Sequence, residues 1–224
     1  MNQLTIIFLL LFCKGLNPSI AFSQTNSQLE IMDSSTYASK LDSFKLKFSK
    51  NKTVIKEYEL ATYIALSYYP ELSATRISFK KAKIKTTLNA RPSLGSLLFR
   101  SRKDRNYVIR INNTVKDSII DFKNIPFNAK VGLLGHEFGH ISDYKDKTIF
   151  QVMKRLFAYS SKKSKAKFEK EIDLITIKKG LGWQLHAWAN YVLNESNAST
   201  KYKVFKKEIY LTPEQIKSLL VTKK

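Results

Sequence analysis

Apolar side chains recur at helical spacing along most of the chain. At about 100° per residue, one side of residues 54–69 gathers Ile55, Tyr58, Ala61, Ile64, Ala65 and Tyr68. The same spacing predicts further helices over residues 37–48, 149–159, 164–179 and 183–194. A last short helix is expected after the capping box Thr212-Pro213-Glu214-Gln215.

The middle of the chain changes to the alternating pattern of strands. Tyr107, Ile109 and Ile111 alternate with polar residues over 106–112, and residues 76–88 alternate above a basic face. Residues 97–100 are expected to form a third, short strand. We therefore expect an α+β fold of the zincin type, in which a short antiparallel sheet packs on a central helix, with helices at both ends of the chain.

That central helix is predicted over residues 129–143, with Asn128 as its N-cap. Its apolar side chains gather on one side, and the glycines form a separate stripe, at positions 132, 135 and 139. Glycine costs about 1 kcal/mol in a helix interior, so the stripe indicates close approach by another backbone.

The polar face of this helix carries the motif H-E-x-x-H. His136 and His140 lie four residues apart, so one helix face presents both imidazoles to a single metal ion. Glu137 lies beside them, where a carboxylate acts as the general base toward a water at the metal. This pattern predicts a zinc site that performs hydrolysis.

A catalytic zinc site needs a third protein ligand. Glu169 and Asp173 are spaced four residues apart and share a face of a predicted helix. Glu171 would replace Glu169 if that helix were rotated. Asp146, just beyond the histidine helix, and His186, on a later helix, are two further candidates for the third ligand.

H-E-x-x-H followed by a helical E-x-x-x-D resembles the gluzincin metallopeptidases, both the thermolysin-like and the membrane-embedded HtpX-like groups. The chain also resembles small secreted zincins of Bacteroidota-type bacteria. The resemblance implies that His136, His140 and Glu169 bind Zn²⁺ and that Glu137 is the general base. It further implies that Asp173 accepts a hydrogen bond from His136 and fixes its tautomer. The oxyanion donor is expected to be His186, with Tyr191 and Arg110 as weaker candidates.

The N-terminus predicts secretion. Residues 4–12 form an apolar run too short to span a bilayer, and Ala21-Phe22-Ser23 offers a cleavage site before Gln24. Residues 24–224 are then expected to form one metallopeptidase domain without a transmembrane segment. Cys13, the one cysteine, would be removed with the leader, which excludes a cysteine-rich structural zinc site. Lipid attachment at Cys13 is disfavoured by the bulky Phe12 before it.

The chain is strongly basic. Its net charge of +21 falls by one to +20 when the leader, with Lys14, is removed. Residues 76–110 hold eleven Lys/Arg and one acid, and residues 154–170 hold seven and one. Such surfaces are either solvated faces or attract anionic envelope surfaces, whereas no nucleic-acid motif is present.

The sequence therefore predicts a secreted or periplasmic zinc metallopeptidase acting on peptides or proteins. Residues 106–112 are expected to hold an extended substrate by strand addition. A second hypothesis is a hydrolase of different amide bonds, such as those of cell-wall peptides. A third is a non-catalytic, envelope-binding basic protein whose zinc site is structural or vestigial.

Overall fold

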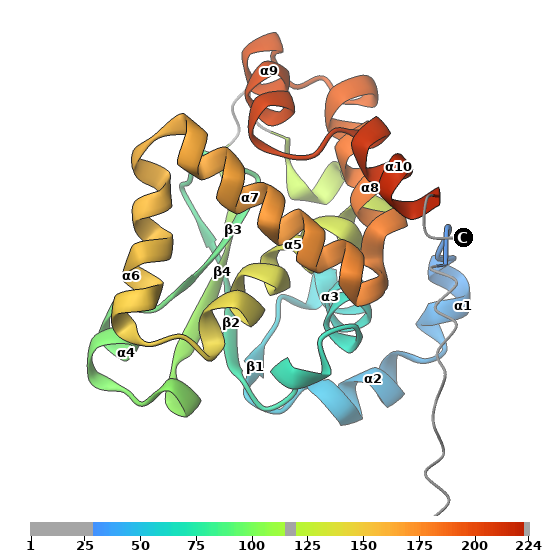
Figure 1. The fold of residues 1–224 in the computed structure, drawn as a ribbon. Coiled ribbons are helices and arrows are strands. Elements are labelled where there is room, and N and C mark those ends of the chain that lie inside the picture. Colours follow the sequence, from blue (N-terminus) through green and yellow to red (C-terminus); the bar gives the residue numbers. More distant parts are fainter. Residues whose placement is uncertain (1–28, 115–119, 222–224) are drawn as a thin grey trace, which may run out of the picture.

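The computed structural model describes residues 29–114 and 120–221, so the expected signal peptide lies outside the described residues. The helices are α1 (Ser34–Ala38), α2 (Leu41–Phe48), α3 (Glu59–Ser67), α4 (Leu94–Phe99), α5 (Phe127–Lys145), α6 (Ile149–Phe157), α7 (Lys162–Thr176), α8 (Gly182–Asn190), α9 (Thr200–Ile209) and α10 (Pro213–Val221) (Figure 1). Short 3₁₀ and π turns join several of them. Helix α10 begins with the predicted capping box, in which Thr212 and Gln215 exchange hydrogen bonds. No helix among residues 29–114 and 120–221 is long and apolar enough to cross a bilayer.

Within the described residues, the strands form one mixed sheet in the order β1-β2-β4-β3. The strands are β1 (Lys52–Thr53), β2 (Arg76–Ala82), β3 (Leu88–Pro92) and β4 (Asn106–Asn112). Strands β1, β2 and β4 are parallel, and only β3 runs antiparallel, beside β4. The α+β class is confirmed, but the expectation of an antiparallel sheet is wrong.

The order of the strands in the sheet explains why the sheet is mostly parallel rather than antiparallel. Strands β2 and β3 follow each other closely in sequence without forming a hairpin, because β4 lies between them. The alternating burial of a strand is the same in parallel and antiparallel pairs, so the pattern could not reveal the direction. The third strand expected at residues 97–100 is also wrong, because Leu94–Phe99 form helix α4.

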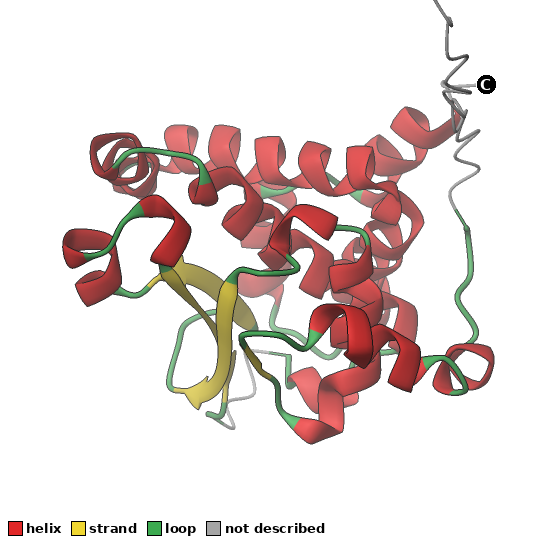
Figure 2. Ribbon diagram, turned by 90° about the horizontal axis from the view of Figure 1, so that it is seen from below, coloured by secondary structure: helices red, strands yellow, loops and turns green. Residues whose placement is uncertain are grey.

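The sheet has one buried face. Phe79 of β2 and Ile109 of β4 are register partners, and Ala90 of β3 lies opposite Ile109 on the other side. All three are buried, and the ring of Phe79 meets Phe138 of α5 edge-on at 6.4 Å. Figure 2 shows the strands toward one side of the molecule and most helices toward the other. Helix α5 thus packs against β3 of the sheet and against helices α3, α7 and α8.

Helix α5 begins earlier than expected. Its N-cap is Pro126 rather than Asn128, whose side chain instead bonds the backbone N and O of Met32, at 2.8 and 3.0 Å. The predicted close approach by another backbone is present at Gly132, whereas an added Cβ at Gly135 or Gly139 would meet side chains. A Cβ on Gly132 would meet the carbonyl oxygen of Gln184 at 2.0 Å, so α8 crosses α5 in backbone contact.

Candidate metal centre

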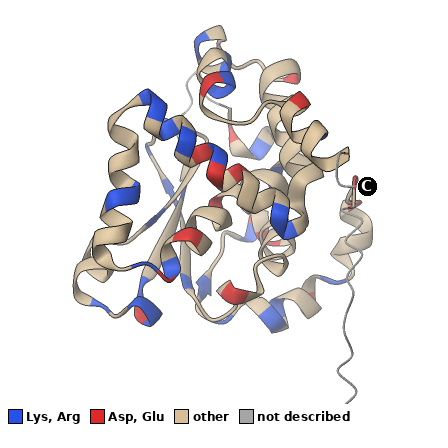
Figure 3. Cartoon of the chain, in the orientation of Figure 1, with Lys and Arg blue, Asp and Glu red and all other residues tan. Residues whose placement is uncertain are grey.

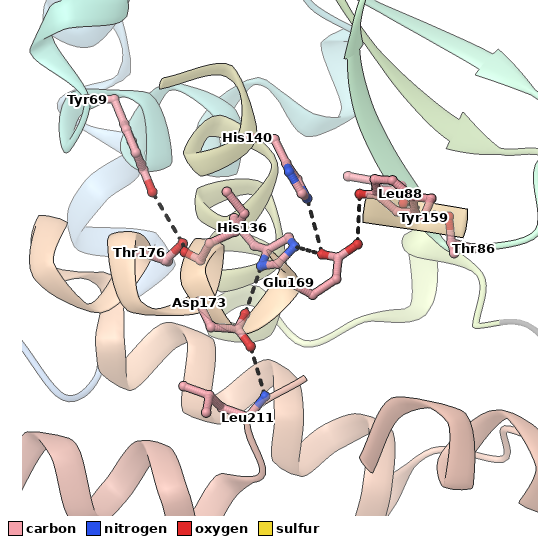
Figure 4. Close-up of polar contacts among 11 residues, drawn as sticks. Tyr69, Thr86, Leu88, His136, His140, Tyr159, Glu169, Asp173, Thr176 and Leu211 are labelled. Atoms are coloured by element: carbon pink, nitrogen blue, oxygen red, sulfur yellow. Dashed lines mark hydrogen bonds and ion pairs between the residues drawn. The ribbon is translucent and has the colours of Figure 1, made fainter. Parts of the chain in front are cut away.

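Two crossing helices bring the site together. Helix α5 supplies His136 and His140 one turn apart, and α7 supplies Glu169. Oε2 of Glu169 lies 3.1 Å from Nε2 of His136 and 3.3 Å from Nε2 of His140 (Figure 4). All three side chains are buried. The E-x-x-x-D helix therefore packs with its acidic face against the histidines.

This triad fits a metal ion. One ligand atom from each of His136, His140 and Glu169 lies within 4.8 Å of the others. For bonds of about 2.0–2.2 Å in a tetrahedron, neighbouring ligand atoms are about 3.3 Å apart, which matches the distances from Glu169. Two imidazoles with one carboxylate form the ligand set of many hydrolytic zinc sites, which leave one position open.

A second layer of hydrogen bonds orients the triad. Nδ1–H of His136 donates to Oδ1 of Asp173 at 2.8 Å, which leaves Nε2 to face Glu169. The hydroxyl of Tyr159 donates to the other oxygen of Glu169, Oε1, at 2.8 Å. Oδ2 of Asp173 accepts from the backbone N–H of Leu211. Such partners fix the tautomer and rotamer of metal ligands.

The electrostatics also favour a cation. Burial disfavours the imidazolium of His136, but hydrogen bonds from its ring to Asp173 and Glu169 outweigh burial and raise its pKa to about 10. Burial likewise opposes ionisation of Glu169, yet the two histidines hold the pKa of Glu169 well below its usual range. A carboxylate kept anionic at this depth requires a positive partner, either a protonated imidazole or a metal ion.

Glu137 is separate from the triad. Its Oε2 is buried without a hydrogen-bond partner, and burial raises the pKa of its carboxyl. Glu137 and His136 line a cavity of about 30 Å³. Since one water needs about 10–15 Å³ of such volume, the cavity accommodates one or two waters but no peptide. Glu137 thus has an oxygen without a hydrogen-bond partner and lines a cavity in which a water can bind.

Two residues that no sequence pattern singles out, Lys206 and Tyr210, also line this cavity. Lys206 is buried, and its Nζ lies 3.9 Å from the centre of the Tyr210 ring and 5.4 Å from that of Trp188. The Tyr210 ring meets that of His136 edge-on at 5.6 Å. Lys206 is one of several lysines on α9, and only the tertiary packing distinguishes it from Lys207.

His186 lies away from the metal centre. It is half-buried beside Trp183 in a separate depression that also includes Lys217. On α8 the neighbouring Leu185, Trp188 and Ala189 line the cavity beside Glu137, whereas His186 does not. The structure therefore does not bring His186 into the cavity beside Glu137.

The remaining candidate residues also lie away from the cavity beside Glu137. Glu171 accepts from Arg155 at 2.5 Å, and the Asp146 side chain is 84% exposed beyond the end of α5. Tyr191 donates to the backbone of Asn124, and Arg110 donates to Asn89. None of these four residues lines the cavity beside Glu137. Among the carboxylates proposed as a third ligand, Glu169 is the one that meets both histidines.

Comparison of the chain with protein-family models, curated proteins and solved structures found no match. Functional inference therefore rests on the geometry of the site itself: a buried His-His-Glu group that can hold a metal ion, beside a carboxylate with a free oxygen.

Proposed function

We propose that the protein is a secreted zinc metallopeptidase, with residues 24–224 as its single catalytic domain. The observation that supports this most directly is the position of Glu137: it has an unpartnered oxygen, it lines the same cavity as His136, and His136 belongs to the buried His136, His140 and Glu169 group. A structural metal needs no such carboxylate, whereas hydrolysis needs a base beside the metal.

The chain's own residues divide the work. His136, His140 and Glu169 hold the metal, and Asp173 keeps His136 in the tautomer that leaves Nε2 free. Bound Zn²⁺ would polarise the substrate carbonyl and make a water in the site more acidic. Glu137 takes a proton from the attacking water and passes it to the leaving amine, a role that suits a carboxyl whose pKa burial has raised.

Because His186 does not line the cavity, another residue is needed to stabilise the oxyanion. Lys206 lines the same cavity as Glu137 and carries a positive charge over the Tyr210 ring. A cation there stabilises the oxygen that becomes negative during attack on the carbonyl. We assign this role to Lys206, supported by the hydroxyl of Tyr210, whose pKa burial raises well above its usual value and so keeps it protonated.

We also propose β3, rather than β4, as the strand to which an extended substrate is added. Strand β4, the expected partner, is already paired on both sides, by β2 and β3. Strand β3 is at the end of the sheet, and its Leu88 lines the cavity. An extended peptide added along β3 would therefore run past the metal centre. Since the cavity is too small for a peptide, residues covering it, such as Tyr210 and Leu211, must move on binding.

The experiment is a metal analysis followed by a cleavage assay. Purified protein should retain about one zinc per chain and cleave a peptide library, and a chelator should abolish cleavage. The competing hypothesis, a basic envelope-binding protein with a structural or vestigial zinc, predicts bound zinc without any turnover. An Edman or mass-spectrometric N-terminus at Gln24 would support secretion with removal of residues 1–23.

A further inference from the structure

Helix α6 exposes apolar side chains to solvent. Phe150 is 87% exposed, Phe157 is 68% exposed, and Met153 lies between them. At about 100° per residue, these three fall within about 60° of one another, so they form one stripe. The packed side of α6 is a different stripe, in which Val152 is buried. The exposed stripe therefore takes no part in packing the core.

Helix α4 adds a second apolar group on the same edge of the molecule (Figures 1 and 2). Leu94, Leu98 and Phe99 are exposed, Phe99 to 86%. The segment after α4 is joined to the start of α6, because Arg105 donates to the backbone oxygen of Lys147 at 2.7 Å. Exposed apolar side chains on two short helices at one edge of the molecule indicate an interaction surface.

A basic groove borders the exposed stripe. Its volume is about 540 Å³, it lies between α6 and α7, and Phe157 and Phe168 form part of its wall. Its basic residues are Lys147, Lys154, Arg155 and Lys167, against one acid, Glu171. Arg155 is paired with Glu171 and Asp143, and Lys147 is also paired with Asp143. Lys154 and Lys167 are therefore the bases of the groove that make no ion pair with the described residues. Figure 3 shows that Lys and Arg continue along α6 and the first half of α7.

We propose that α4, α6 and this groove, here called the α4–α6 face, bind the surface of an anionic phospholipid bilayer. Phe99, Phe150 and Phe157 insert among the acyl chains near the headgroups, and the basic groove receives lipid phosphates. Interfacial helices combine an apolar stripe and flanking Lys/Arg in this way. The exposed apolar side chains suit the acyl chains, and the bases carry the charge opposite to that of the lipid phosphates.

The α4–α6 face adjoins the metal centre. Phe168, in the groove wall, meets the ring of His140 edge-on at 5.3 Å, and Arg155 lies 4.8 Å from the centre of the Phe168 ring. Binding there would place the site close to proteins at the membrane surface. An anionic bilayer is then the envelope component that the basic charge serves, whether or not the protein cleaves peptides.

The test is sedimentation with vesicles of phosphatidylcholine alone or with about 30% phosphatidylglycerol. Wild-type protein should bind the anionic vesicles at least about tenfold more tightly, and high salt should weaken this binding. The variants Phe150→Ser/Phe157→Ser and Lys154→Glu/Lys167→Glu should each lose at least about tenfold in affinity. Leu46→Ser is the matched control, because Leu46 is 88% exposed on α2, outside this face.

Three outcomes would overturn the proposal: no binding to anionic vesicles, equal binding to both vesicle types, or a loss with Leu46→Ser as large as with the α6 variant. Circular dichroism and zinc content show that each variant is folded. Cleavage of a soluble peptide, measured without vesicles, should be unchanged in all variants. Failure of the bilayer proposal is thereby separated from failure of the proposed peptidase activity.

Discussion

Asp173 accepts a hydrogen bond from the backbone N–H of Leu211 through Oδ2 at 2.9 Å, while its Oδ1 lies 2.8 Å from Nδ1 of His136 (Figure 4). One carboxylate therefore holds both a histidine of the metal centre and the chain that covers the cavity. Movement of Leu211 during substrate entry would remove one of the two hydrogen bonds of Asp173. The orientation of His136 is thus coupled to the closure of the site.

Asp173→Asn should weaken zinc binding about 10–100-fold, the usual effect of losing the partner of a ligand histidine. Competition with a fluorescent chelator measures the affinity. Glu171→Gln is the control on the same helix, because Glu171 pairs with Arg155 and not with the histidines. Equal affinities in the two variants would contradict the assigned role of Asp173.

His136→Ala combined with His140→Ala should abolish stoichiometric zinc binding, since it removes two of three ligands. Elemental analysis of the purified protein gives the zinc content. His186→Ala serves as the control, because His186 lies in a separate depression, and this variant should keep its zinc. Stoichiometric zinc in the double variant would place the metal elsewhere.

Glu137→Gln should keep zinc and lower turnover about 10²–10⁴-fold, the scale for a lost general base. The change preserves shape and removes the proton acceptor, so metal content and thermal stability should stay close to those of the wild type. Turnover of a peptide substrate and zinc content are measured on the same preparation. Undiminished turnover would remove Glu137 from the mechanism.

Lys206→Met should lower turnover about 10²-fold or more, because it removes the charge assigned to the developing oxyanion. Methionine keeps the apolar stem that packs beside Trp188 and Tyr210. Lys207→Met is the neighbouring control, since Lys207 is exposed and should have no effect. If kcat is the same in the two variants, a group other than Lys206 stabilises the oxyanion.

Gly132→Ala should destabilise the fold by about 2 kcal/mol or more, since overpacking forces the backbone of α8 away from α5. The added Cβ would lie 2.0 Å from the oxygen of Gln184. Gly95→Ala, in α4, is the control, because nothing lies within 4 Å of its added Cβ. Urea unfolding measures both variants, and similar midpoints would contradict the close α5–α8 crossing.

The sequence was informative where function depends on local spacing. His136 and His140 share a face because a helix repeats about every 3.6 residues. The same rule puts Glu169 and Asp173 together, and helix packing then brings both pairs into contact. Strand β4 was also predicted with its observed bounds, because its alternation is regular over its whole length.

Other features depend on long-range packing and leave no local signal. The direction of the strands follows from how the chain connects them, and the pattern of Tyr107, Ile109 and Ile111 does not record that. The rotation of α8 about its axis decides which of its side chains line the cavity, and the sequence around His186 does not record that rotation. Lys206 was missed because Trp188, which its ammonium also approaches, belongs to α8 and leaves no signal near Lys206 in the sequence.

The His136–Glu169 contact spans 33 residues of sequence, in a chain whose one cysteine lies in the expected leader. A metal held there would act as a reversible cross-link between α5 and α7. Closing a loop of this length with a disulfide is worth about 3–4 kcal/mol in the chain-entropy picture. In this protein a chelator would then have the effect that a reductant has on a disulfide-bonded domain: the fold would weaken together with the chemistry.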